Sequence, residues 1–435
     1  MWLQAITVFA LIVSSVPQNT LDLAGLGIKR EDFFLRLQKT INLAKVTNLI
    51  LRDNKFDNFV DCSTNLTSLK YLDLSQNHLQ QFFFLCQDEY NLNTLNVSRN
   101  KLQYITHDAL NHRIPNLKVL DLSSNELSFV NETMLEHFEV LTYLSLANNP
   151  MNDGIHVNAF SNLKQLQYLS LSNVSLSYVS VEMFKPLVNL STLDLSRNPI
   201  RTIPTLPSTI VELDLSNTMI TQLNNISLPD LQELKLNDMR NLEVLCFDDL
   251  ENLPRLKILS LTGSKKLAHL TSNRYDERRF PPLMQLSVNN CSLRTLDHSF
   301  LWIIKRMPIL NFDGNPWNCD CRMKWIKEDG NKTLSRNIKC YTPERHRGKR
   351  LSEVPEDDLE CEGDSTVFYP VLWACIMLLI VAFVLAMGFF FLRRPIGAWS
   401  IDRNRDTVRY TNVDASSTDM VRILPGGETC DRNGE

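Results

Sequence analysis

The sequence predicts a curved α/β solenoid with a parallel sheet on its concave face, a disulfide-rich cap and one transmembrane helix. Three observations predict this architecture: a leucine pattern that recurs over residues 46–314, a group of cysteines within 315–361, and an uncharged stretch over 367–392. The chain has 435 residues, of which 44% are hydrophobic and 22% charged, and its formal net charge is −4. Because neither a basic composition nor a nucleic-acid-binding motif is present, we expect no nucleic-acid partner.

The N-terminal 45 residues are predicted to be a leader followed by a cap. Residues 1–15 are short and apolar and end in two serines, so we interpret them as a signal peptide; the alternative is an ordinary core strand. Residues 16–45 form the N-terminal capping segment. Within it Leu21, Leu23 and Ile28 predict a degenerate first strand, and residues 31–45 a capping helix or loop.

The repeats follow the pattern L-x-x-L-x-L-x-x-N-x-L, with the cleanest copy over residues 69–79. The spacing between successive starts is mostly about 24 residues, inside the roughly 20–29 residues of such repeats. The other copies begin at Val46, Leu92, Leu117, Leu141, Leu166, Leu190, Ile210, Leu231, Leu256, Leu283 and Met307.

Physical chemistry assigns a role to each position of the repeat. The L-x-L core predicts a short strand, so Leu72 and Leu74 point inward and Asp73 outward. The asparagine that follows is expected to satisfy buried backbone groups of the turn. The late phenylalanines are expected to pack inside the convex wall: Phe160, Phe184, Phe247 and Phe300.

These residues resemble the leucine-rich-repeat family, and the short proline-containing repeat at Pro204 and Pro207 is similar to those of Toll-like receptor ectodomains. The resemblance implies a stacked solenoid, since one repeat cannot bury its leucines alone. The chain shows no nucleophile, metalloprotease, phosphate-loop or C-x-x-C motif, so we expect neither an enzyme nor a cofactor.

After the last repeat, residues 315–361 resemble the cysteine-rich C-terminal cap of extracellular leucine-rich-repeat proteins. The resemblance implies the pairs Cys319–Cys340 and Cys321–Cys361. A zinc site at the C-x-C pair is the weaker alternative, because no histidine stands at a usual ligand spacing. We therefore expect no metal.

Two further cysteines, Cys62 and Cys86, stand at nearly equivalent positions of successive repeats. They are expected to form a disulfide in an oxidising compartment, with two buried thiols as the alternative. Cys291, at an asparagine position, is expected to be a buried free thiol.

Residues 362–366 are interpreted as a linker, 367–392 as a transmembrane helix and 393–435 as a disordered cytoplasmic tail. Arg393 and Arg394 give the positive flank expected on the cytoplasmic side, so we predict a single-pass type I protein of the plasma membrane. The N-x-S/T sequons, candidate glycosylation sites, all precede the span: Asn65, Asn96, Asn131, Asn173, Asn189, Asn225, Asn290 and Asn331. In the tail, Tyr410 fits an inhibitory phosphotyrosine motif, an adaptor site, a sorting signal, or an inert residue.

Outward strand positions form two columns on the concave face. The residues we select as ligand-binding candidates are Tyr71, Tyr143, Tyr168, Asp121 and Asp194. Tyrosines suit protein interfaces, and the carboxylates favour a basic partner surface. The alternative is that these residues are ordinary filler of the repeat.

Two functions are compatible with these features. The first is a cell-surface receptor or adhesion protein that binds a protein ligand through its repeats, with a co-receptor or a second copy as further partner. The second is a non-signalling accessory, decoy or trafficking partner of a larger Toll-like receptor of innate immunity. The tail discriminates between them.

Overall fold

The computed structural model describes residues 19–35, 43–61, 66–85, 89–106, 109–224, 226–272, 280–328, 332–361 and 368–392. Several predicted features lie outside these residues and stay predictions. They are the signal peptide over 1–15, Cys62 and Cys86, the sequons at Asn65, Asn225 and Asn331, and the tail with Tyr410.

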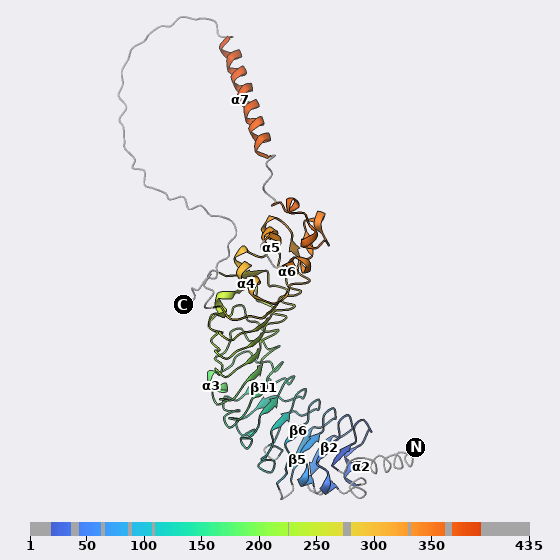
Figure 1. Ribbon diagram of the computed structural model, residues 1–435. Helices are drawn as coiled ribbons and strands as arrows, with labels where there is room; N and C mark the ends of the chain where they lie inside the picture. The colour runs from blue at the N-terminus through green and yellow to red at the C-terminus, as the bar shows by residue number, and fades with distance from the viewer. Residues whose placement is uncertain are drawn as a thin grey trace, which may run out of the picture.

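One 13-stranded parallel sheet runs through the solenoid and lines the inner side of its curve (Figure 1). Each repeat contributes one strand, and residues at equivalent repeat positions pair in register, as Leu72 does with Leu95. The sheet begins with β1, inside the segment predicted as a cap. Its strands are β1 (Thr20–Asp22), β2 (Asn48–Ile50), β4 (Tyr71–Asp73), β6 (Thr94–Asn96), β7 (Val119–Asp121), β9 (Tyr143–Ser145), β11 (Tyr168–Ser170), β12 (Thr192–Asp194), β13 (Glu212–Asp214), β14 (Glu233–Lys235), β16 (Ile258–Ser260), β18 (Gln285–Ser287) and β19 (Ile309–Asn311).

Shorter elements complete the repeats and the cap. Two-stranded parallel sheets pair β3 (Asn58–Asp61) with β5 (Gln81–Phe84), β8 (Phe129–Val130) with β10 (Gly154–Ile155), β15 (Val244–Cys246) with β17 (His269–Thr271), and β20 (Trp317–Asn318) with β21 (Cys340–Thr342). The α-helices are α2 (Arg30–Leu35), α3 (Val181–Phe184), α4 (Leu301–Arg306), α5 (Lys324–Glu328), α6 (Lys332–Asn337) and α7 (Phe368–Leu392).

The core is a continuous column of leucine side chains with aromatic rings behind it. Leu72 and Leu74 are completely buried, as the alternation predicted. The four predicted phenylalanines are also buried, and the rings of Phe247 and Phe300 meet edge to face with centroids 5.0 Å apart. Stacking therefore buries what a single repeat would expose.

The repeat asparagines form a ladder of buried hydrogen bonds. Asn77 donates from Nδ2 to the carbonyl oxygens of Leu51, at 2.9 Å, and Leu74, at 3.0 Å. Its Oδ1 accepts from the N–H of Phe56 at 3.1 Å. One side chain thus satisfies backbone groups of two repeats, which confirms the predicted role of this position.

The ladder changes chemistry after residue 200. Thr218 keeps one bond of the asparagine, from its Oγ1 to the carbonyl oxygen of Leu215 at 2.8 Å. Ser264 donates to Leu236, and Cys291 donates from Sγ to the carbonyl oxygen of Leu261 at 3.2 Å. Cys291 is a buried free thiol, as predicted, and burial raises its pKa to about 11.

The solenoid ends in a cap held by disulfides between Cys319 and Cys340 and between Cys321 and Cys361. These are the pairs implied by the family resemblance. Trp317 is 1% exposed, and Trp325 donates from Nε1 to the carbonyl oxygen of Leu296 at 3.2 Å. The cap therefore covers the apolar end of the last repeats.

Beyond the cap lies α7, whose described side chains, residues 373–387, are all exposed. Within the part of the chain that the structure describes, none of the helices combines the length and the apolar character that a membrane span requires. The transmembrane span over 367–392 therefore stays a prediction.

Candidate protein-binding face

The clearest feature of the concave face is a stacked pair of tyrosines, Tyr143 on β9 and Tyr168 on β11. Their ring centroids are 4.4 Å apart and their planes differ by 5°. The two residues are register partners, and neighbouring strands lie about 4.8 Å apart, close to the separation of stacked rings. The repeat spacing itself therefore builds the stack.

Both hydroxyl groups stay protonated at neutral pH. Burial raises the pKa of Tyr143 to about 12, and the neighbouring Tyr168 and the carboxylate of Asp121 add to the increase. Burial also raises the pKa of Tyr168, with the charge of Asp194 as the next cause. The pair therefore offers a half-buried aromatic surface with phenolic hydrogen-bond donors.

The carboxylates of Asp121 and Asp194 are held on either side of the stack by their own turns. Asp121 accepts from the N–H of Ser123 at 2.9 Å, and Asp194 accepts from the N–H of Ser196 at 3.0 Å. Asp194 also accepts from the hydroxyl of Ser170 at 2.9 Å. These bonds fix the side chains and leave negative charge on the open face.

Tyr71 does not join this group. Strand β4 is separated from β9 by β6 and β7, which carry Thr94 and Val119 at the equivalent position. Burial raises the pKa of Tyr71, and the nearby carboxylate of Asp73 adds to the increase. The structure thus brings together four of the predicted residues and places the fifth elsewhere on the same face.

The acidic face extends further than the residues selected from the sequence. Glu212 and Asp214 on β13 and Glu233 on β14 occupy the same outward positions as the predicted candidates. Burial raises the pKa of Asp214, and Lys235 beside it forms an ion pair with Glu233 at 3.2 Å. The alternation along the sequence already places Asp214 in the outward acidic column, and extending it further would have identified Glu212 and Glu233 as well.

The described sequons fall on different surfaces. Asn96 lies on β6, between Asp73 and Asp121, and its Oδ1 accepts from the hydroxyl of Ser98 at 2.7 Å. The other described sequons are exposed: Asn131, Asn173, Asn189 and Asn290. Only Asn96 among the described sequons would place a glycan on the concave sheet.

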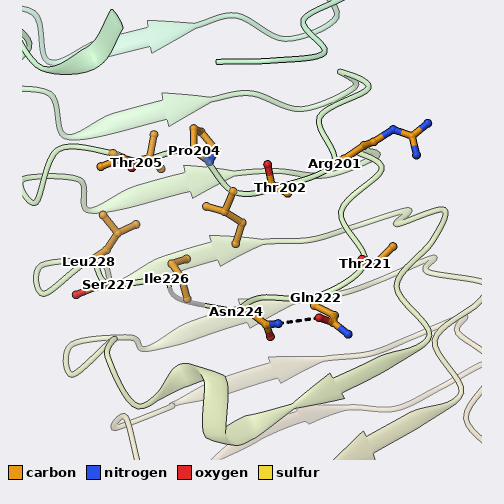
Figure 2. A pocket seen from close by; sticks show the side chains of 12 residues that line it. Arg201, Thr202, Pro204, Thr205, Thr221, Gln222, Asn224, Ile226, Ser227 and Leu228 are labelled. Atoms are coloured by element: carbon orange, nitrogen blue, oxygen red, sulfur yellow. Dashed lines mark hydrogen bonds between the residues drawn. The ribbon is translucent and has the colours of Figure 1, made fainter. Parts of the chain in front are cut away.

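A pocket of about 460 Å³ lies away from the sheet face, between the segments that follow β12 and β13. It forms where Pro204 shortens a repeat. Figure 2 shows its lining residues on neighbouring turns of the solenoid, with Arg201 extending away from them. The proline is visible in the sequence, but the pocket depends on how neighbouring repeats stack and could not be predicted from it.

Among the described residues, one group has the proximity for metal binding: Asp320, Cys321 and Cys361. Its two cysteines are joined in a disulfide, which removes them as thiolate ligands. The group therefore does not fit a metal.

Comparison with known proteins agrees with the repeat geometry. The family model described as leucine rich repeat matches residues 90–151 and 153–200. The chain therefore contains leucine-rich repeats over these residues. The chain is 28% identical to human vasorin over 168 residues and 31% identical to trophoblast glycoprotein of Macaca fascicularis over 121 residues.

These matches are partial. They cover 35% and 26% of this chain and 25% and 28% of the two relatives. A TLR13 chain, from the crystal structure of a TLR13–ssRNA13 complex, has a TM-score of 0.53 and 22% identity. That match covers 74% of this chain and 55% of the other, and it shows a shared fold.

Proposed function

We propose that this leucine-rich-repeat protein is a single-pass cell-surface receptor or adhesion protein that binds a protein ligand on its concave face. The observation that carries the proposal is the Tyr143–Tyr168 stack, half-buried and flanked by fixed carboxylates. Large aromatic groups with a hydroxyl and a surrounding polar rim are the usual centre of a protein interface. The repeat fold supplies a long curved surface for such contact.

The membrane anchor in this proposal is α7. The 25 residues of this helix include no charged side chain. Its described large side chains are widely exposed, as in Leu379 at 70% and Phe383 at 68%. An apolar surface of this kind is unfavourable in water and favourable in a bilayer, and Arg393-Arg394 supplies the cytoplasmic flank.

The ligand site is tested by the double variant Tyr143→Ala/Tyr168→Ala, with Tyr178→Ala as control. Tyr178 is 75% exposed and lies outside the strands of the large sheet. Surface-proximity labelling in intact cells should recover a protein partner with the wild type and the control. The double variant should lose it at equal surface level, because interface tyrosines contribute roughly 2 kcal/mol or more. Undiminished recovery with the double variant would remove the concave face as the ligand site.

The anchor and the tail are tested separately. An antibody against the repeats should stain intact cells, and one against residues 393–435 should require permeabilisation. Staining of the tail on intact cells would contradict the proposed topology. Replacing residues 393–435 by a neutral sequence should abolish the cellular response of a signalling receptor; an unchanged response would favour the accessory function instead.

A further inference from the structure

We infer that the Tyr143–Tyr168 stack is the centre of a clamp for two arginine side chains of an extended, basic segment of the protein partner. The inference rests on the proposed function and specifies the chemistry of the ligand. One guanidinium would extend the stack beyond Tyr143 and the other would extend it beyond Tyr168.

The stack has two open ends. Because the rings are parallel and belong to register partners on neighbouring strands, they stack in the direction that runs from strand to strand. The outer ring face of Tyr143 therefore turns toward β7, and that of Tyr168 toward β12. The register partners there are Val119 and Thr192, which are short and carry no ring to continue the stack.

Each open end has its own carboxylate. Asp121 follows Val119 by two residues on β7, and Asp194 follows Thr192 by two residues on β12, so each pair points to the same face of the sheet. A guanidinium placed above Val119 would cover the face of Tyr143 and reach Asp121. The equivalent group above Thr192 would cover Tyr168 and reach Asp194.

The charge of the surrounding face selects a basic partner. The acidic residues of β4–β14 that are at least partly exposed are Asp121, Asp194, Glu212, Asp214 and Glu233, whereas Asp73 on β4 is buried. The nearby basic group on these strands, Lys235, is bound to Glu233 at 3.2 Å. Arginine fits better than lysine, because its planar guanidinium stacks on an aromatic ring and pairs with a carboxylate at the same time.

The distance between the ends sets the spacing in the ligand. Strands β7, β9, β11 and β12 are neighbours in that order, so the end positions lie roughly 14 Å apart at about 4.8 Å per step. In an extended peptide, residues i and i+4 are about 13 Å apart and point to the same side. The clamp therefore favours arginines four residues apart in a segment that crosses the strands.

Binding of synthetic peptides to the full-length chain tests this inference. The protein used in this assay has the substitution Ser98→Ala. This substitution removes the Asn96 sequon, so no glycan can cover the Asp121 end of the clamp, and it keeps the Asn96 side chain in place. Three extended peptides serve as probes. The first has arginines at positions i and i+4, and the second has lysines at the same two positions. The third has arginines at i and i+3, whose side chains point to opposite sides. We expect the first peptide to bind about three- to thirtyfold more tightly than the others, the range expected for one aromatic–cation contact.

Variants of the chain assign the two ends. The variants Asp121→Asn and Asp194→Asn remove the charge but keep a side-chain oxygen that can accept the hydrogen bond of the turn, as Asn96 does naturally. Each substitution should lower the affinity for the first peptide about three- to thirtyfold. Thr192→Tyr should add a third ring to the stack and occupy the place of one arginine. It should therefore lower the affinity for the first peptide by a similar factor. Arg201→Gln, outside the clamp, is the matched surface control and should bind normally.

Two results would overturn the inference. One is equal binding of the arginine, lysine and misplaced-arginine peptides; the other is unchanged binding in both aspartate variants. The native partner is measured in parallel with Tyr143→Ala/Tyr168→Ala. If that variant loses the native partner while the peptides show no preference, the clamp is wrong and the proposed protein-binding face stands. If it keeps the native partner, the proposed face is also wrong.

Discussion

The side-chain amide of Asn198 donates to the carbonyl oxygen of Leu171, in the preceding repeat, across 2.6 Å. Its Oδ1 accepts from the N–H groups of Val174 and Leu176, both at 3.0 Å. Val174 occupies the position that is asparagine in most earlier repeats. Asn198 therefore satisfies the turn of a repeat that lacks its own ladder residue.

Replacing Asn198 by leucine should lower the unfolding free energy by about 3 kcal/mol or more, because two backbone N–H groups and three backbone carbonyl oxygens would lose their bonds to its side chain. Thr218→Val is the control, because Thr218 makes a single hydrogen bond to the backbone of its repeat. This substitution should lower the unfolding free energy by only about 1 kcal/mol. Denaturant unfolding of the purified chain measures both. Equal effects of the two substitutions would contradict the special role of Asn198.

Cys321→Ser should open the C-terminal cap by leaving Cys361 unpaired. Loss of a native disulfide in an extracellular domain typically costs about 2–5 kcal/mol, a large part of ordinary stability. We expect retention in the secretory pathway, measured as loss of surface staining at equal synthesis. Cys375→Ser, at an exposed free cysteine, is the control that should reach the surface normally.

Cys291 should resist alkylation in the folded chain. Burial raises its pKa to about 11, so the reactive thiolate is scarce at pH 8, and the thiol is also covered. Mass spectrometry after iodoacetamide treatment should show modification of Cys291 only after denaturation. Modification of the native chain at the rate of a free cysteine would show that this repeat opens readily.

Asp214→Asn should stabilise the chain at neutral pH. Burial raises the pKa of Asp214 above its ordinary value of 3.8, so folding favours the protonated form. The stability contributed by this carboxyl group is complete below its unfolded pKa and is lost as pH rises through the folded pKa. The melting temperature of the variant should therefore be higher than that of the wild type at pH 7, and this difference should vanish as pH falls below about 4. A difference independent of pH would mean that the charge is not the cause.

Asn96 should be unmodified, whereas the exposed Asn131 and Asn189 should carry glycans. Asn96 lies between Asp73 and Asp121 on the sheet, and a hydrated glycan there would cover the early part of the proposed face. Glycopeptide mass spectrometry decides the occupancy of each site. A glycan on Asn96 would move ligand contact toward Tyr168, Asp194 and the later strands.

The repeat pattern predicted the core and its ladder from local rules. Leu72 and Leu74 had to point inward because a strand alternates, and Asn77 had to serve the turn because its backbone groups would otherwise be buried unpaired. Such features follow from the position that a residue occupies in the repeat pattern, so the sequence contains them. The cap disulfides followed from family resemblance, because spacing alone does not define cysteine pairing.

The sequence by itself determined which side chains face the concave surface, because alternation along a strand is a local property. Only the tertiary structure decided which of them meet. Stacking of repeats set Tyr143 against Tyr168 at 4.4 Å, put Tyr71 beyond two intervening strands, and made Val119 and Thr192 the register partners on either side of the pair. The physical reason is that contact between repeats depends on register and strand separation, which arise only when the whole solenoid buries its leucines together.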